Sequence, residues 1–128
     1  MDQDELEFLN EIRVDFYKDA PDQLNSCEEY ILKYKDSGDI EEIGKLKRVV
    51  HSLKGSAQAV EFMKMANYFH LFENVLVKNI DALKQDPYID FMLNFVDNIR
   101  KYTECFQHKI PVEDMETKIE QSLKMKMV

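Results

Sequence analysis

The chain has 128 residues, of which 45% are hydrophobic and 33% charged, a composition that predicts one globular domain with one core. Its net charge of −8, from 17 basic and 25 acidic residues, argues against nucleic acid and an anionic membrane surface as partners. Glycine and proline number only three each, so turns are few and long helices are expected.

The expected compartment follows from the N-terminal residues and the cysteines. Residues 1–11 are acidic and contain no apolar run, so we expect no signal peptide, and no stretch is long enough to span a membrane. Cys27 and Cys105 do not lie in a metal-binding spacing, and we interpret them as reduced core thiols. These features predict a cytoplasmic protein.

Apolar residues recur every three or four positions almost throughout the chain, which predicts helices and no strands. The first helical segment runs from Leu9 to Tyr34, and Pro21 either kinks it or starts a second helical piece. Gly38 is the expected C-terminal cap of this segment, and Asp39 is the expected N-cap of the next.

Four more helical segments are predicted. Apolar residues at helical spacing occupy residues 43–60 in the second segment and 65–83 in the third, with a junction near residues 61–64. The fourth segment opens at Asp86-Pro87, and a short fifth opens at Pro111.

This pattern predicts an all-α fold in one domain over residues 1–128. We expect an up-down-up-down four-helix bundle over about residues 4–109, with an additional short C-terminal helix over about residues 111–126. The C-terminal helix is expected either to pack on the outside of the bundle or to be loosely attached.

The second segment carries a polar set beside its apolar stripe. His51, Lys54, Gly55 and Gln58 are spaced i, i+3, i+4 and i+7, roughly 120° around the helix from the stripe. This places His51 at the flank of the core, within reach of solvent or a partner. A glycine inside a helix costs about 1 kcal/mol relative to alanine, so Gly55 is expected to have a compensating role.

The third segment is expected to fold back on the second as an antiparallel hairpin centred on residue 62. Residues at equal distances from the turn then face each other, so His51 should lie opposite Glu73, and Lys54 opposite His70. Two histidines, a lysine and a glutamate would meet on one partly exposed patch.

These residue types suit phosphoryl transfer. A Glu73 carboxylate that accepts a hydrogen bond from one nitrogen of His51 would fix the tautomer and leave the other nitrogen free to accept a phosphoryl group. Lys54 would neutralise phosphate charge, and Gly55 would let the loop of a partner approach closely.

The stretch His51-Ser52-Leu53-Lys54-Gly55-Ser56-Ala57 resembles the HxxKG[SG][AS] signature of histidine phosphotransfer (HPt) domains. The stretch His70-Leu71-Phe72-Glu73-Asn74-Val75-Leu76 resembles the third helix of one branch, the N-terminal phosphotransfer domain of the chemotaxis histidine kinase CheA. The resemblance implies a five-helix layout over nearly the whole chain. It also implies phosphorylation of His51, with Glu73, Lys54 and His70 in its hydrogen-bond network.

The chain departs from the family pattern at two positions. The family usually has glycine ten residues after the phosphorylated histidine, where this chain has Glu61, and often a small residue at the position of Gln58. The dimerisation, ATP-binding and coupling domains of a chemotaxis kinase do not follow in these residues. A free-standing carrier and a fragment of a larger kinase are both compatible with this.

The expected function is therefore that of a monomeric phosphocarrier and not of an enzyme. His51 would accept a phosphoryl group from a histidine kinase catalytic domain or a response-regulator receiver domain, and would pass it to a receiver aspartate. Gly55, Gln58 and Ser52 would contact the partner. No nucleotide-binding motif is present, so no cofactor and no metal of the chain's own are expected.

The sequence leaves three alternatives to a phosphocarrier open. The chain could be a docking or regulatory module that binds a receiver or kinase domain without being phosphorylated. It could be a purely structural bundle. A zinc site from His51, His70 and Glu73 is also conceivable, although Lys54 would oppose a cation there.

Overall fold

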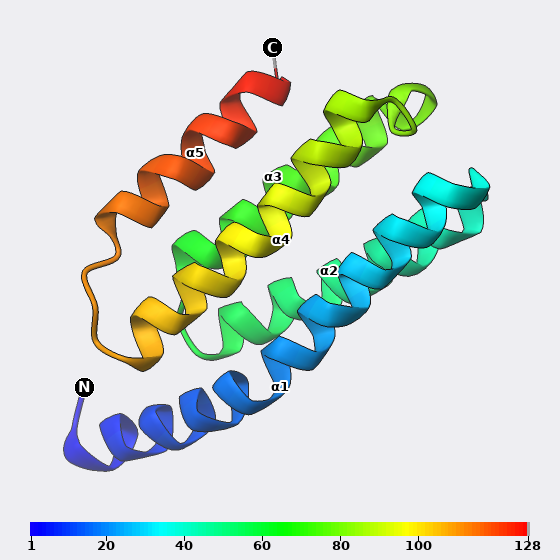
Figure 1. The fold of residues 1–128 in the computed structure, drawn as a ribbon. Coiled ribbons are helices and arrows are strands. Elements are labelled where there is room, and N and C mark those ends of the chain that lie inside the picture. Colours follow the sequence, from blue (N-terminus) through cyan, green and yellow to red (C-terminus); the bar gives the residue numbers. More distant parts are fainter. Residues whose placement is uncertain (128) are drawn as a thin grey trace.

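The structure, a computed structural model, describes residues 1–127, and every regular element in that range is helical, which confirms the all-α class. Figure 1 shows the arrangement of five α-helices, with one short 3-10 helix between the third and the fourth. The elements are α1 (Gln3–Ser37), α2 (Ile40–Ala59), α3 (Met63–Lys78), η1 (Ile80–Ala82), α4 (Asp86–Gln107) and α5 (Glu113–Met127).

The predicted capping residues set the boundary between α1 and α2. Gly38 ends α1 with a φ of 68°, in the left-handed region that glycine tolerates, and donates its N–H to the Tyr34 carbonyl at 2.8 Å. Asp39 begins α2 by accepting a hydrogen bond from the Glu41 N–H at 3.0 Å. Pro87 lies in the first turn of α4, also as predicted.

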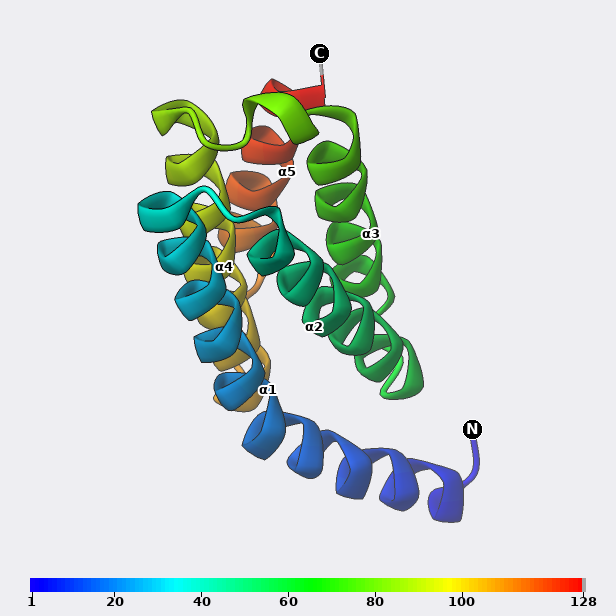
Figure 2. The same ribbon diagram turned by 90° about the vertical axis from the view of Figure 1, so that its right-hand side faces the viewer.

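α1 is one helix of 35 residues with Pro21 inside it. Proline cannot donate a backbone hydrogen bond, and its ring crowds the preceding turn, so a bend is expected there. Figure 2 shows the N-terminal part of α1 bending and projecting past the ends of the other helices. Of the two predictions for Pro21, the kink is confirmed and the separate helical piece is wrong.

The helices share one hydrophobic core, to which all five contribute buried side chains. α1 packs on α2 and α4, and α2 packs on α3. Aromatic rings join α3 to α4, because Phe72 stacks on Phe95 with ring centroids 4.1 Å apart and Phe69 meets the same ring edge-on at 6.0 Å.

The third helix ends earlier than the apolar spacing predicts. α3 ends at Lys78, so Ile80 and Leu83 lie in η1 and at its end. The backbone and side-chain N–H groups of Asn79 both donate to the Val75 carbonyl, at 3.1 and 2.9 Å, and this closes the helix. Leu83 is still fully buried. The prediction that it belongs to the core is confirmed, and the prediction that it belongs to the third helix is wrong.

α5 begins at Glu113, two residues later than predicted. Lys109 adopts a φ of 56° after the end of α4, and residues 108–112 form the connection. The Val112 carbonyl accepts the first hydrogen bond of the helix, from the Glu116 N–H at 2.9 Å. Pro111 therefore precedes the helix and does not open it.

α5 packs firmly on the outer side of α3 and α4, away from α1 and α2 (Figure 1). The Tyr102 hydroxyl donates to the Glu116 carboxylate at 2.6 Å, and the Tyr68 hydroxyl donates to the Glu120 carboxylate. Loose attachment of this helix is therefore wrong. Its buried residues are Met115, Ile119 and Leu123.

Candidate functional site

The exposed face of α2 lies where the helical spacing places it. Val50 and Leu53 are buried in the core, whereas the His51 side chain between them is 73% exposed. Lys54, one turn further on, is only 18% exposed, because it lies on the side of α2 that meets α3. His51 is thus a solvent-accessible imidazole one helical turn from a largely buried lysine side chain.

The turn between α2 and α3 fixes the register of the two helices. It spans residues 60–62, and the Phe62 N–H closes it by donating to the Ala57 carbonyl at 2.9 Å. Glu61 has a φ of 62°, in the left-handed region where glycine is favoured. This backbone shape explains why glycine suits the position, and a non-glycine residue there costs about 1 kcal/mol.

This register brings His51, Lys54 and Glu73 together. Glu73 Oε2 lies 4.0 Å from His51 Nδ1, and Glu73 Oε1 lies 3.1 Å from Lys54 Nζ. The 4.0 Å distance is an electrostatic contact, longer than a hydrogen bond. Glu73 is 20% exposed, and its buried Oε1 accepts no well-aligned hydrogen bond from residues 1–127. The ammonium group of Lys54 balances this carboxylate by charge.

The other predicted site residues lie nearby but make no such contact. His70 is exposed on α3 and forms no hydrogen bond or ion pair within the described part of the chain, and the partner of Lys54 is Glu73 instead of His70. Ser52 and Gln58 are exposed on α2. A Cβ at Gly55 would have no neighbour within 4 Å, so packing inside this chain does not require glycine there.

This arrangement suits the transfer of an anionic group. His51 turns Nδ1 toward a carboxylate, which leaves Nε2 as the ring nitrogen available to an electrophile. The Lys54 ammonium beside the same carboxylate places a positive charge one helical turn from His51, where it would offset the charge of an anionic group. The surface at Gly55 is open, because no atom of the chain lies within 4 Å of the position of a Cβ there.

Over residues 1–127, no cluster of three His, Cys, Asp or Glu side chains is arranged to hold a metal ion. None of the helices in that range combines the length and apolar character needed to cross a bilayer. Both cysteines are free and buried, and burial raises the pKa of the Cys27 thiol to about 12, which makes it a poor nucleophile.

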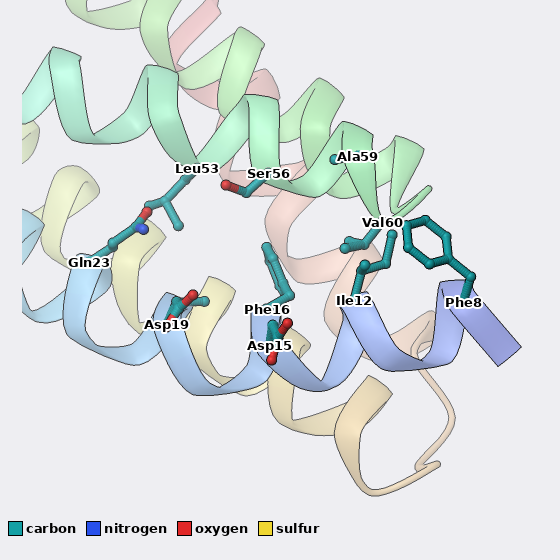
Figure 3. Close-up of a pocket in the computed structure, with 11 residues that line it drawn as sticks. Phe8, Ile12, Asp15, Phe16, Asp19, Gln23, Leu53, Ser56, Ala59 and Val60 are labelled. Carbon is teal, nitrogen blue, oxygen red and sulfur yellow. The ribbon is translucent and has the colours of Figure 1, made fainter.

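The structure contains a surface groove that the spacing of apolar residues did not predict. A groove runs between the N-terminal half of α1 and the C-terminal half of α2, with Phe8 at one end and Gln23 near the other (Figure 3). Phe8 lies outside the apolar stripe that begins at Leu9. An aromatic residue outside the stripe is the sequence feature that could have indicated the groove.

The chain is similar to a family of known domains and to two curated proteins. The family model of the Hpt domain matches residues 11–102. The chemotaxis protein CheA of Bacillus subtilis (strain 168) is 28% identical over 87 residues, which cover 66% of this chain and 13% of that protein. The chemotaxis protein CheA of Rhizobium meliloti (strain 1021) is 35% identical over 69 residues, which cover 53% of this chain and 9% of that protein.

The chain thus spans only a small part of the length of these relatives. No solved structure matches it significantly. The family match covers His51, Lys54, Gly55, His70 and Glu73 and extends over most of the helices described above. The chain therefore belongs to the Hpt domain family and resembles the phosphotransfer domain of CheA.

Proposed function

We propose that this chain is a histidine phosphotransfer protein in which His51 accepts a phosphoryl group and passes it to or from a receiver-domain aspartate. The observation that carries the proposal is the shared carboxylate of Glu73. One of its oxygens faces Nδ1 of an exposed histidine, and the other pairs with a covered lysine. This geometry in an Hpt family member favours a reactive imidazole over a structural one.

In the proposed step, the Nε2 lone pair of His51 attacks the phosphorus atom of an aspartyl phosphate or of ATP held by a partner. The nitrogen–phosphorus bond forms, the phosphorus–oxygen bond breaks, and its electron pair leaves on the aspartate carboxylate or on ADP. Positive charge then develops on the ring while Nδ1 keeps its proton. Movement of His51 by about 1 Å toward Glu73 Oε2 would close a hydrogen bond that stabilises this charge.

The neighbouring residues have supporting roles in this proposal. Lys54 offsets the negative charge of the phosphoryl group, and His70 supports the polar network from α3. Gly55, Ser52 and Gln58 form the surface on which the partner domain docks. A Cβ or a larger group at Gly55 would project into the space that the partner has to occupy.

The proposed partners are a response-regulator receiver domain and a histidine kinase catalytic domain. They supply the phosphoryl donor or acceptor, so the carrier needs neither ATP nor a cofactor of its own. We also propose a monomeric, single-domain protein in which α1–α4 form an up-down-up-down four-helix bundle and α5 covers one side. Two free cysteines are compatible with a reducing, cytoplasmic location.

Phosphotransfer from a phosphorylated kinase catalytic core or receiver of the same cell tests the proposal. The expected product is an acid-labile phosphoryl group on His51, which a fresh receiver removes. The chain has three histidines, so His70→Gln and His108→Gln serve as matched controls for His51→Gln. Only His51→Gln should abolish labelling, whereas Gly55→Leu should slow it.

Labelling that survives His51→Gln would contradict the proposal. Saturable binding of the same partner without any labelling would favour the alternative, a docking module that regulates its partner and is not phosphorylated.

A further inference from the structure

A second groove, the α3–α5 groove, lies on the side of α3 away from α2. The two helices are parallel neighbours, because the Tyr68 hydroxyl donates to Glu120 and Lys64 pairs with Glu116 at 3.3 Å, an offset of 52 residues in both contacts. Toward the C-terminal ends of the two helices, hollows of about 260 and 300 Å³ open on the surface. Parallel helices that end together therefore leave an open groove at one end of the molecule.

The lining of the α3–α5 groove is largely apolar. Met127 lines both hollows, together with Leu71 and Leu123 in one and Val75 and Val77 in the other. Part of this surface is left in water, since Val77 is 58% exposed and Met127 is 44% exposed. Apolar side chains that share an exposed groove are typical of a surface that binds a partner.

Lysines surround the α3–α5 groove. Lys78 comes from the last turn of α3, and Lys124 and Lys126 come from the last turn of α5. The single acidic side chain in the lining, Glu120, already accepts the hydrogen bond of Tyr68. Lys78 and Lys124 are exposed and form no ion pair within residues 1–127. The local charge is therefore positive, on a chain whose net charge is −8.

The rim of the groove is held in place by contacts with α4. The Lys126 ammonium lies 4.8 Å from the centre of the Tyr88 ring, and the Tyr88 hydroxyl donates to Asn79 Oδ1 at 2.8 Å. The Asn79 side chain in turn donates to the Val75 carbonyl at 2.9 Å. This chain of contacts fixes the end of α5 against the end of α3. A preformed groove binds at a smaller entropic cost than one that has to be ordered by its ligand.

The α3–α5 groove is separate from the proposed phosphoacceptor. Glu73 faces His51 on α2, whereas Leu71 and Lys78 lie about 160° and 140° around α3 from Glu73. A molecule held in the groove would leave His51 free.

We propose that the α3–α5 groove is a docking site for an acidic amphipathic helix of a partner protein. The two hollows that share Met127 suit two apolar anchors one helical turn apart, as leucines at i and i+4 would place them. Aspartate or glutamate beside these anchors would meet Lys78 and Lys124.

The size of the groove limits the length of this contact. On α3 the lining runs from Leu71 to Lys78, and on α5 from Glu120 to Met127, about 10 Å along each helix. Two turns of a partner helix would cover it. An anionic lipid surface fits less well, because the chain as a whole carries a net charge of −8.

A designed peptide tests this site independently of phosphotransfer. The probe is a fluorescein-labelled helix of about 15 residues, with leucines at i and i+4 and glutamates beside them. One control peptide has lysine in place of glutamate, and another has glutamine in place of leucine. Fluorescence anisotropy with the full chain should show saturable binding of the glutamate–leucine peptide and about tenfold weaker binding of both controls. The net charge of −8 alone would favour the lysine peptide, so a preference for glutamate reports the lysines of the groove.

Two matched pairs of variants locate the binding. Met127→Ala should weaken it about three- to fivefold, whereas Met125→Ala, also exposed on α5 but outside the α3–α5 groove, should not change it. Lys124→Glu should weaken it about tenfold, whereas Lys101→Glu, at an exposed position of α4, should have little effect. All four side chains are exposed, so the fold should survive each change.

Three results would overturn the proposal. One is no saturable binding, or binding that Met127→Ala and Lys124→Glu leave unchanged. Another is tighter binding of the lysine peptide than of the glutamate peptide. The third is binding to phosphatidylserine vesicles without binding to the peptide, because a lipid surface would then be the occupant of the groove.

Discussion

At the scale of single residues, the Glu73 carboxylate links the two halves of the candidate site. Its two oxygens face different neighbours, Lys54 at 3.1 Å and His51 at 4.0 Å. Lys54 and Glu73 are largely shielded from water, so each charge depends on the other more than charges in an exposed pair do. The lysine therefore stabilises the carboxylate that faces the histidine.

Replacing Lys54 by methionine should lower both stability and transfer. The change leaves the buried Glu73 oxygen without a countercharge, so the free energy of unfolding should fall by about 1–3 kcal/mol. Urea denaturation measures this loss. Adding Glu73→Gln should cost less than the two single changes summed, because the partners share one interaction.

The exposed pair Lys33–Glu29 within α1 provides the control for this comparison. Lys33→Met should leave the unfolding curve unchanged, since exposed ion pairs contribute little. Equal effects of Lys54→Met and Lys33→Met would show that the Lys54–Glu73 pair does not hold the site.

A second prediction at this scale concerns Glu61, which adopts a φ of 62° in the turn between α2 and α3. Glu61→Gly should raise the free energy of unfolding by about 0.5–1 kcal/mol, because glycine relieves the left-handed strain. Lys109→Gly, at a φ of 56°, should have a similar effect. Glu104→Gly, inside α4, should have the opposite effect. Destabilisation by Glu61→Gly would mean that its side chain outweighs the strain.

At the scale of helices, α5 is held by two tyrosines that lie far from it in the sequence. Tyr68 on α3 donates to Glu120, and Tyr102 on α4 donates to Glu116. Both rings are buried, and burial next to these carboxylates raises the pKa of each hydroxyl above its ordinary value near 10. Each hydroxyl is therefore kept protonated and remains a donor to α5.

The attachment of α5 should weaken in alkali. Above about pH 10 a tyrosine in the unfolded chain loses its proton, whereas Tyr68 and Tyr102 in the fold retain theirs, so ionisation favours the unfolded state. The stabilisation is complete below pH 10. It should then fall by about 1.4 kcal/mol per pH unit for each tyrosine.

Urea denaturation at pH 8, 10.5 and 11 measures this slope. The double variant Tyr68→Phe/Tyr102→Phe should reduce it, whereas Tyr30→Phe, on α1 and outside the contact with α5, should not. An unchanged slope in the double variant would assign the alkaline loss to other groups.

The elements show which features a sequence can predict. Local rules predicted the caps at Gly38 and Asp39, because a cap depends on residues within one turn. A symmetry about residue 62 predicted that His51 meets Glu73, because the short hairpin turn leaves little freedom of register. The same symmetry placed Lys54 opposite His70, but Lys54 pairs with Glu73 instead, because the register of two helices does not decide which neighbour a flexible side chain contacts.

Features that depend on distant or competing contacts were mispredicted or missed. The spacing of apolar residues continues through Ile80 and Leu83, but the side chain of Asn79 takes a backbone acceptor and ends α3. Tyr68 and Glu120 are 52 residues apart, so no local sequence pattern predicts that α5 packs against α3. The groove depends on how α1 bends against α2, which only the packed structure defines.

At the scale of the whole molecule, the buried side chains form one core that extends from Phe16 on α1 to Leu123 on α5. The hydroxyl–carboxylate contacts of α5 lie at the border of this core, and burial of Leu123 adds an apolar contribution of about 2 kcal/mol. No helix carries a core of its own. A chain built in this way should unfold as one cooperative unit.

Comparing two probes of unfolding tests this last prediction. Circular dichroism follows all the helices, whereas tyrosine fluorescence follows the rings and can be used because the chain has no tryptophan. The two urea curves should coincide, with the same midpoint and slope.

Leu123→Ala should move both curves together to lower urea, because it lowers the free energy of unfolding by about 2–4 kcal/mol. A tyrosine transition that moves to lower urea while the helical transition stays in place would show that α5 unfolds by itself, and the chain would then be a four-helix unit with a separable fifth helix.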